Sequence, residues 1–378
     1  MTFNSMLEFL NKIINGFYES NFIYGAIFFI FLYQFIVLFW ARNVNWKLKT
    51  LHYKGKQRVH EGETPRLGGL ICFLYLFIFS LILREKIFAD NLQVILACLL
   101  PMMLVTLKED LTHDVDYKIR FLGTILSATA LIIFANQSLP HVNHIIVISD
   151  LFQSPVFSFV FYSLCLMAVA NGCNFIDGMN GLLGFYLLGA LLSCLQLTYI
   201  VDDVFMAIPI ILLIEMIILF LLVNFPWGKI FMGDSGAYLM ALILGIWVIN
   251  FFGTYNKISS WNACLIFFYP IAEVTYSTIR KFLQKKSPFH PDREHLHLKV
   301  YDILNTTLKK PRLSNNLTTV FLAIFWLAPP LILPWVLDSQ IMIFFSICLM
   351  SFVYLALNLL IPNKNEYDPF LEKTKKNL

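Results

Sequence analysis

The sequence predicts an all-α integral membrane protein, built as one polytopic bundle of about 11 transmembrane helices. Hydrophobic residues make up 58% of the 378 residues and charged residues 14%, against roughly 45–50% and about 25% in soluble domains. A soluble chain cannot bury that much apolar surface. A disordered chain would be poor in aromatic residues, which make up 16% here. The net charge of +4 is too weak to indicate a nucleic-acid partner.

Long apolar runs define the expected spans. A helix needs about 20 apolar residues to cross the hydrocarbon core, and unpaired backbone groups are too costly in lipid for any open strand. Gly, Pro, Asn and charged residues separate the runs, as expected for loops. The eleven runs are 22–41, 67–83, 92–107, 120–135, 156–171, 182–200, 204–223, 237–252, 261–278, 317–337 and 341–360.

Lysine and arginine are distributed unevenly between the two sides of this bundle. Alternate loops, from 42–66 to 361–378, together with Arg120 hold 24 of the 28 basic residues. The positive-inside rule assigns them to the cytoplasm. The N-terminus is then outside and the C-terminus in the cytoplasm, which requires an odd number of spans. We expect a single membrane-embedded domain over 1–378, with a polar cytoplasmic tail over 362–378.

Five polar motifs lie on the cytoplasmic side of the predicted bundle, and the first four stand at helix ends. They are TPRLGG (64–69), KED (108–110), NGCNFIDGMNG (171–181), FMGDSG (231–236) and SPFHPDREHLH (287–297). Because separate segments bring polar residues to one face of the membrane, they predict one shared site.

Four acids form the centre of this prediction. Glu109, Asp110, Asp177 and Asp234 come from three different loops. Carboxylates at a low-dielectric boundary repel one another and need a counter-charge. Mg²⁺ prefers oxygen ligands and keeps several waters for substrate phosphates. The acids therefore predict a magnesium site, with Mn²⁺ as the alternative ion, although each acid alone is equally consistent with a solvated loop.

The amide-rich motif indicates a ligand with many hydrogen-bonding groups. Asn171, Asn174 and Asp177 are spaced by three residues, which places them along one helical face. Amides donate and accept hydrogen bonds, which suits a nucleotide or a sugar, and Asn180 follows between two glycines. A capped helix end would explain Asp177 and the next glycine, but not two further amides in phase.

The acid of FMGDSG has two compatible interpretations. Asp234 and Ser235 are good N-cap residues for the helix that follows. A helix N-terminus with an acid beside it can also position a metal-bound phosphate.

Three histidines lie in the longest basic loop. His290, His295 and His297 accompany Arg293, and imidazole with guanidinium can bind a diphosphate. The spacing does not match the HExxH pattern of zinc proteases. A single histidine is usually a packing residue, but a cluster of three favours binding.

Some polar residues receive no role from the sequence. Arg66, with its neighbours in TPRLGG, fits a helix start with close-packed glycines as well as it fits a site. Glu215 and Glu273 lie within or near apolar runs, where an acid is a functional candidate by default. No motif surrounds either acid, so both remain unassigned.

Taken in order from Thr64 to His297, these motifs resemble those of the polyprenyl-phosphate N-acetylhexosamine-1-phosphate transferases, glycosyltransferase family 4. The same superfamily contains the phospho-muramoyl-pentapeptide transferases. The segments NGCNFIDGMNGL and FMGDSGAYL are specific to the superfamily as a pair. SPFHPDREHLH is similar to the hexosamine branch.

The resemblance implies transfer of a sugar-1-phosphate from a UDP-sugar to polyprenyl phosphate, such as undecaprenyl phosphate, with release of UMP. The sugar would be an N-acetylhexosamine, and the product would start a lipid-linked cell-envelope glycan such as O-antigen. The resemblance also implies Mg²⁺ and an active site on the cytoplasmic face of the inner membrane.

The resemblance carries over to the four acids. Glu109 and Asp110 match the family's paired acids, one of which helps to deprotonate the lipid phosphate or handles the metal. Asp177 matches the acid near the nucleotide and sugar-phosphate, and Asp234 matches the metal-binding acid, with Asp110 as a second metal candidate. The pair is usually Asp-Asp, so Glu109 places its charge one methylene further out.

The remaining matches concern substrate binding. Phe231 matches an aromatic residue that stacks on uracil, and His295 and His297 match histidines that contact the diphosphate. The family often has an acid where Asn180 stands and another histidine where Leu298 stands, so nucleotide contacts are expected to differ. The full set of expected binding residues is Asn171, Asn174, Asn180, Phe231, His290, Arg293, His295 and His297.

Alternatives remain at this point. The 287–297 segment argues against transfer of a muramoyl-pentapeptide phosphate. A transporter would carry its acids at the bilayer midplane and would show broken helices in paired repeats. Glu109 leaves open a relative that binds a UDP-sugar without turnover. The sequence leaves open the exact sugar and whether the protein forms a homodimer.

Overall fold

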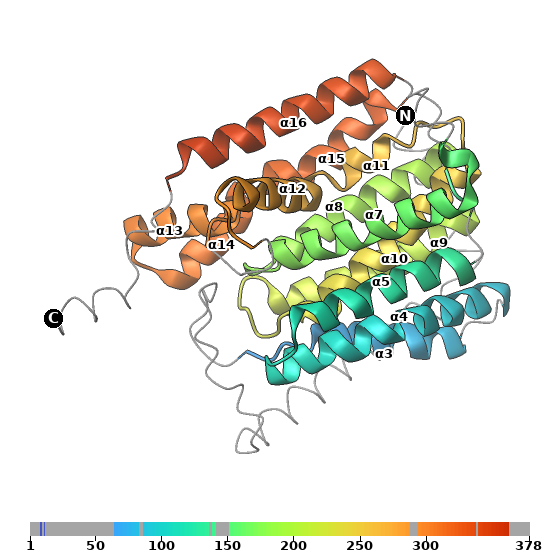
Figure 1. The fold of residues 1–378 in the computed structure, drawn as a ribbon, viewed down its shortest axis with the longest axis horizontal. Coiled ribbons are helices and arrows are strands. Elements are labelled where there is room, and N and C mark those ends of the chain that lie inside the picture. Colours follow the sequence, from blue (N-terminus) through green and yellow to red (C-terminus); the bar gives the residue numbers. More distant parts are fainter. Residues whose placement is uncertain are drawn as a thin grey trace.

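The computed structural model describes residues 8–9, 11, 64–82, 86–135, 138–140, 151–287, 293–337 and 339–362. These parts of the chain are helical with connecting loops and contain no strand, so the all-α prediction is confirmed. The elements, shown in Figure 1, are α3 (Gly68–Ile82), α4 (Lys86–Thr112), α5 (Tyr117–Phe134), η1 (Leu151–Gln153), α7 (Pro155–Ile176), α8 (Leu182–Ile200), α9 (Val204–Asn224), α10 (Gly233–Thr254), α11 (Asn262–Ile266), α12 (Phe268–Leu283), α13 (Leu296–Leu308), α14 (Pro311–Phe321), α15 (Ala323–Val336) and α16 (Gln340–Leu360).

Most of the predicted spans coincide with these helices. Within the described residues, eight helical segments are long and apolar enough to cross a membrane, and α3 is a shorter apolar helix. The run 182–200 matches α8 at both ends, and 204–223 matches α9 to within one residue. The first predicted span, 22–41, and the tail after residue 362 lie outside the described residues. The chain is a multi-pass membrane protein.

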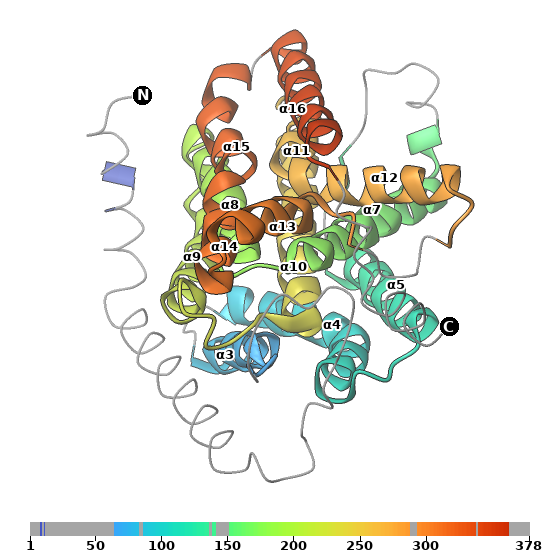
Figure 2. The same cartoon turned by 90° about the vertical axis from the view of Figure 1, so that its left-hand side faces the viewer.

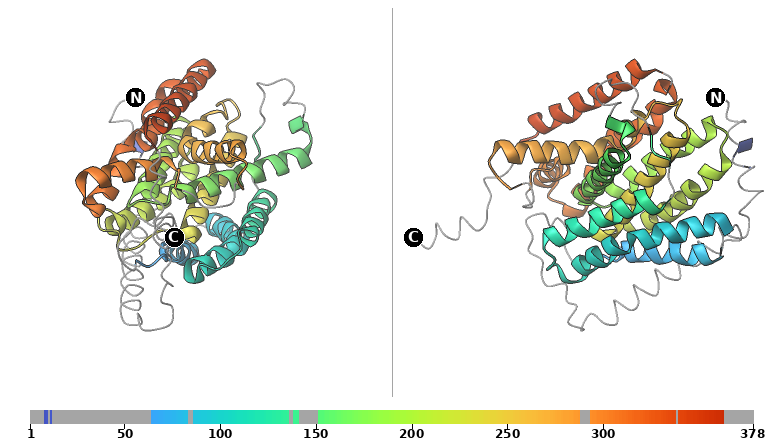
Figure 3. Two further views of the ribbon diagram at one scale, coloured as in Figure 1. Left: turned by 60° about the vertical axis from the view of Figure 1, so that its left-hand side comes forward. Right: turned by 45° about the vertical axis from the view of Figure 1, so that its right-hand side comes forward.

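The predicted span 261–278 differs from the structure. It is divided into the short helix α11 and the helix α12, which meet at Phe267. Neither part qualifies as a membrane span by length and composition. Arg280 and Lys281 lie in the last turn of α12, and α12 runs across the direction of the other helices (Figure 2, Figure 3). The apolar run is thus broken at Phe267, and its second part, α12, packs against α7.

The predicted span 317–337 begins earlier in the structure and contains a second break. It consists of α14 and α15, which meet at Leu322, and the combined segment Pro311–Val336 is long enough to cross a membrane. Three prolines lie inside α15, and proline removes a helical hydrogen bond and bends the helix.

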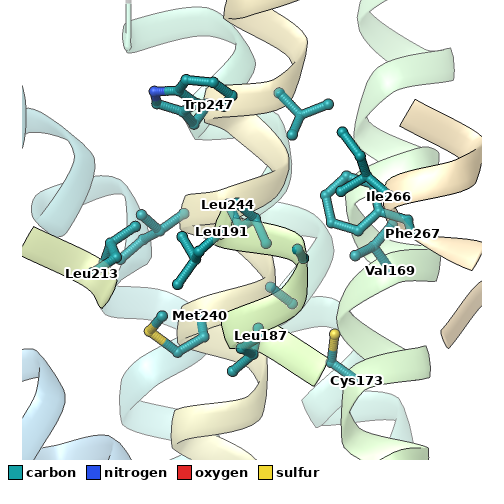
Figure 4. Packing of buried hydrophobic residues seen from close by; sticks show 14 of the residues in the cluster. Val169, Cys173, Leu187, Leu191, Leu213, Met240, Leu244, Trp247, Ile266 and Phe267 are labelled. Atoms are coloured by element: carbon teal, nitrogen blue, oxygen red, sulfur yellow. The ribbon is translucent and has the colours of Figure 1, made fainter. Parts of the chain in front are cut away.

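Helix α10 forms the centre of the bundle. It is buried along almost its whole length and packs against α3, α4 and α7 (Figure 2). Met240, Leu244 and Trp247 of α10 lie in the core, opposite Leu187 and Leu191 of α8 (Figure 4). A helix that is apolar on every side is stable when other helices surround and bury it. Its N-terminal residues are therefore carried into the middle of one end of the molecule.

That end of the bundle collects the loops that carry the motifs. It lies at the left in Figure 1, where α13 and α14 also lie. The backbone of Gly68 donates to Phe231, that of Gly69 to Met232, and that of Phe231 to Pro65, at 2.9–3.0 Å. The segments TPRLGG and FMGDSG, far apart in the sequence, therefore lie side by side.

Candidate functional site

Asp110, near the end of α4, holds the first turn of α10. Its Oδ1 accepts the backbone N–H of Asp234 at 2.8 Å. Its Oδ2 accepts the backbone N–H and the hydroxyl of Ser235 at 2.9 and 2.6 Å. Gly233 has φ +74°, and a Cβ there would lie 2.7 Å from both oxygens, so glycine is required for this approach. The predicted local N-cap is replaced by an acid from another helix, which satisfies the free N–H groups of α10.

Asp234 lies in a clamp of donors from three other segments. Its Oδ1 accepts from Arg66 at 2.9 Å and from the Asn174 amide at 3.0 Å. Its Oδ2 accepts from Arg120 at 2.8 Å. The Asp234 side chain is 7% exposed and each arginine side chain 28%. Such charge-assisted hydrogen bonds are short and strong, so this carboxylate remains an anion at the membrane boundary.

Asp177 completes the predicted acid cluster at the C-cap of α7. Burial raises the pKa of Asp177 to about 7, because the lowering effect of Arg66 does not compensate and Asp234 repels the charge. Burial by itself would lower the pKa of Arg66, but Asp234, Asp110 and Asp177 outweigh it, so that pKa lies above its usual value. Asp177 is therefore an acid without enough positive charge around it.

Glu109 faces away from its neighbour. Its Oε2 accepts the backbone N–H of Val115 at 2.9 Å, and its Oε1 lies 3.9 Å from the guanidinium of Arg120. The side chain thus ties the loop after α4 to the start of α5, where Arg120 lies. Glu109 belongs to the cluster through Arg120.

The predicted amides divide into two groups. Asn174 contacts Asp234, and Asn171 accepts from the Tyr238 hydroxyl at 2.9 Å. Asn180 is buried elsewhere: its backbone N–H donates to Asn315 at 2.7 Å, and its amide donates to Asn316 at 3.0 Å. In this structure Asn180 joins the 177–181 loop to α14.

Phe231 lies in the loop that leads into α10 and is half-buried. Its backbone pairs with Pro65 and Gly68, so Phe231 lies where the segments TPRLGG and FMGDSG meet, three residues before Asp234.

His295 and His297 form a second polar cluster, which lies against the amide-rich motif. His295 and His297 are 3% and 2% exposed, and their rings stack 5.8 Å apart. A Cβ on Gly178 would lie 2.4 Å from His297 Nε2, so His297 touches the amide-rich motif. Burial lowers the pKa of His297 to about 3, and its Nδ1 has no hydrogen-bond partner among the residues that the structure describes.

Arg293 and His290 have different outcomes. The Arg293 guanidinium lies 2.8 Å from Asp302 of α13, an ion pair that anchors the start of that helix. His290 lies outside the described residues.

The residues present fit a hard divalent cation. Among the described residues, no group of three or more His, Cys, Asp or Glu side chains is placed so that it could hold a metal ion. The donors are nevertheless carboxylate and amide oxygens, which Mg²⁺ prefers. Four carboxyl groups face two guanidinium groups, so the cluster has more acids than cations. A divalent ion held by Asp177 and Asp234 would supply positive charge.

Sequence reasoning missed four residues that organise the site. From the sequence, Arg120 contributes only to the charge of the basic loops, and Arg66 fits a helix start as well as a site. Ser235 is expected only as an N-cap residue. The sequence assigns no role to Glu273, yet its Oε2 lies within hydrogen-bond distance of His295 Nδ1, at 3.0 Å. For both arginines, the available signal is a cation at a predicted membrane boundary. Their common partner, Asp234, lies 114 residues from Arg120 and 168 residues from Arg66.

With a divalent cation bound, the site would orient anionic groups such as phosphates. Guanidinium groups, a helix N-terminus and amides converge at the edge of an apolar bundle, and each of these groups can donate to phosphate oxygens. The acids add a place for a metal ion that accompanies those phosphates.

Comparison with known proteins gives a consistent result. The family model described as glycosyl transferase family 4 matches residues 92–252. The undecaprenyl-phosphate alpha-N-acetylglucosaminyl 1-phosphate transferase of Yersinia pestis is 28% identical over 281 residues, 71% of this chain and 74% of that protein. The transferase of the same name from Escherichia coli K12 is 25% identical over 277 residues, 71% and 73%. That of Thermotoga maritima is 27% identical over 252 residues, 66% and 72%.

Proposed function

We propose that this chain, which is similar to glycosyl transferase family 4 over residues 92–252, transfers an N-acetylhexosamine-1-phosphate from a UDP-sugar to undecaprenyl phosphate. UMP leaves, and the lipid-linked sugar starts a cell-envelope glycan. The single observation that carries the proposal is the convergence of Asp110, Asp177 and Asp234 with Arg66 and Arg120 at the helix ends.

The reaction joins two anions. A phosphate oxygen of the lipid forms a bond to the sugar-bearing phosphorus, and the diphosphate P–O bond to UMP breaks. Electrostatic repulsion and alignment are the main obstacles. Arg66 and Arg120 supply guanidinium groups for phosphate oxygens at the place where Asp234 now holds them. Mg²⁺, when bound, neutralises phosphate charge.

Each acid has a distinct part in the proposal. Asp177 and Asp234 would hold the metal. Asp110 keeps the first turn of α10 in place through the backbone N–H groups of Asp234 and Ser235 and the Ser235 hydroxyl, which its oxygens accept. Glu109 positions Arg120 through the loop after α4.

The substrates would approach from different phases. Phe231 would stack on uracil, and Asn171 and Asn174 would face the nucleotide-sugar. His295 and His297 would lie near the diphosphate. The site would face the cytosol from the inner membrane, with the prenyl chain among the apolar helices. The acid cluster is built within one chain, so the reaction does not require a homodimer.

UMP release tests the proposal. Purified protein receives undecaprenyl phosphate, Mg²⁺ and one UDP-sugar at a time: UDP-GlcNAc, UDP-GalNAc or UDP-muramoyl-pentapeptide. We expect release that requires the lipid and a hexosamine donor, stops with a chelator and returns with added Mg²⁺. Release only with the pentapeptide donor, or none with any donor from folded protein, would contradict the proposal.

Asp234→Asn is the matched variant. It removes the anion that holds both arginines, and removal of one such electrostatic contact lowers turnover by about 10²–10³-fold. Asp114→Asn is the control, because Asp114 is an exposed acid in the loop after α4. Full turnover by Asp234→Asn would exclude the role assigned to Asp234.

A further inference from the structure

Glu273 of α12 is an acid buried in an apolar setting. Its residue exposure is 1%. The carboxylate lies close enough to the phenols of Tyr269 and Tyr354 to act on them electrostatically, and these rings pack on Phe325. Burying a carboxylate costs more than burying an apolar side chain of the same size unless its partners compensate. A packing role alone does not account for an acid here.

Both oxygens of Glu273 are directed at the start of α13. Oε2 lies 3.0 Å from Nδ1 of His295, and Oε1 accepts the backbone N–H of Leu296 at 3.2 Å. Burial alone would raise the pKa of Glu273, but the hydrogen bond and charge of His295 hold it below the usual value. Glu273 is therefore an anion that accepts, and His295 donates from Nδ1.

The same contact fixes the direction of the imidazole ring. Phe175 lies 5.0 Å from the ring of His295 on one side, and His297 stacks on it at 5.8 Å. Phe175 is the residue between Asn174, which holds Asp234, and the end of α7. With Nδ1 held by Glu273 and the ring held by Phe175, the orientation of Nε2 is determined by packing against the amide-rich motif.

We infer that Glu273 is a positioning residue for the transfer reaction: it holds His295 with the proton on Nδ1 and keeps the ring against Phe175 of the amide-rich motif, where the diphosphate of the UDP-sugar would bind. The inference rests on the proposed function for the identity of the ligand. A carboxylate behind a histidine fixes its tautomer and orientation.

Three variants separate this role from a structural one. Glu273→Gln keeps the shape and an acceptor for Leu296 but removes the charge. Glu273→Asp keeps the charge one methylene further away. Glu294→Gln is the matched control, since Glu294 is also a buried acid at the start of α13 but pairs with Arg280 at 2.9 Å. Thermal unfolding of each variant reports whether the protein is folded.

The first measurement is binding of UDP to the full chain by calorimetry, with the KM for UDP-sugar and for undecaprenyl phosphate where turnover is present. We expect Glu273→Gln to weaken UDP binding about tenfold and to raise the KM for UDP-sugar without changing that for the lipid. Glu273→Asp should recover part of the loss, and Glu294→Gln should bind UDP as the wild type does. Wild-type UDP binding by folded Glu273→Gln would overturn the inference.

The second measurement is ¹⁵N NMR of histidine-labelled protein, with the His295 signals assigned by their loss in His295→Gln. In the wild type Nδ1 should be protonated, and in Glu273→Gln the signals should move toward a mixture of tautomers. Unchanged ring signals in Glu273→Gln would also overturn the inference. A wild type that binds UDP but releases no UMP contradicts the proposed reaction, while the UDP comparison and the NMR still decide the role of Glu273.

Discussion

At the scale of single residues, neighbouring acids serve different partners. Asp110 is saturated by the first turn of α10, whereas Glu109 points to Val115 and Arg120. Successive residues of a helix point about 100° apart, so an acid pair in sequence is not an acid pair in space. The extra methylene of Glu109 is used to reach the Val115 backbone.

The role of Glu109 can be tested with two conservative variants. Glu109→Gln keeps an oxygen acceptor for Val115 and should retain at least half of the wild-type turnover. Glu109→Asp is too short for that contact and should lose several-fold, because the loop that positions Arg120 is released. UMP release at saturating substrates is the measurement. Higher turnover of Glu109→Asp than of the wild type would instead place Glu109 in the chemistry.

At the scale of elements, the site depends on how closely α3 approaches α10. A Cβ on Gly69 would lie 2.1 Å from the backbone N of Gly236 and 2.4 Å from Ser235 Oγ. The backbones of the two helix starts are thus in contact, and Ser235 is the residue that donates to Asp110. Packing of α3 and the geometry of the acid cluster are consequently linked.

Gly69→Ala tests this link, and Gly245→Ala in α10 is its control. The new methyl group meets backbone atoms that cannot move aside, so we expect destabilisation of about 1–3 kcal/mol or more and loss of turnover. Gly245→Ala in α10 meets only the end of the Leu166 side chain, at 2.5 Å, and should be milder. Thermal unfolding and UMP release measure both. Equal effects of the two substitutions would contradict the close-approach argument.

At the scale of the whole molecule, the helix ends divide into two faces. The acid cluster, α13 and α14 lie at one end of the bundle (Figure 1), and that end corresponds to the basic loops. The other end includes the turn after α10 with Lys257. The charge asymmetry therefore predicts that the site faces the cytosol.

Cysteine labelling in sealed vesicles tests this orientation. Lys310→Cys, before α14, and Lys257→Cys, after α10, are both exposed positions. A membrane-impermeant maleimide should label Lys310→Cys only in inside-out vesicles and Lys257→Cys only in right-side-out vesicles. The unsubstituted chain, whose seven free cysteines lie within helices, gives the background. The opposite pattern would reverse the predicted topology.

The sequence by itself determined the fold class and most helix positions, and it predicts the side of the membrane on which the motifs gather. Hydropathy is a local sum over about 20 residues, so spans such as α8 and α9 follow from composition alone. The positive-inside rule is equally local, because it needs only the loop charges. Asp234 and Asn174 could be selected in the same way, since their types and spacing already limit their chemistry.

Only the tertiary structure decided which of these groups act on one another. The apolar run 261–278 breaks at Phe267, which brings Glu273 against His295. Arg66 and Arg120 meet Asp234 across 168 and 114 residues. Pairing of charges depends on where helix ends meet in three dimensions, and close packing of α3, α7 and α10 sets that meeting point. No local property of the chain determines which charges meet. The arginines that pair with these acids are therefore known only from the tertiary structure.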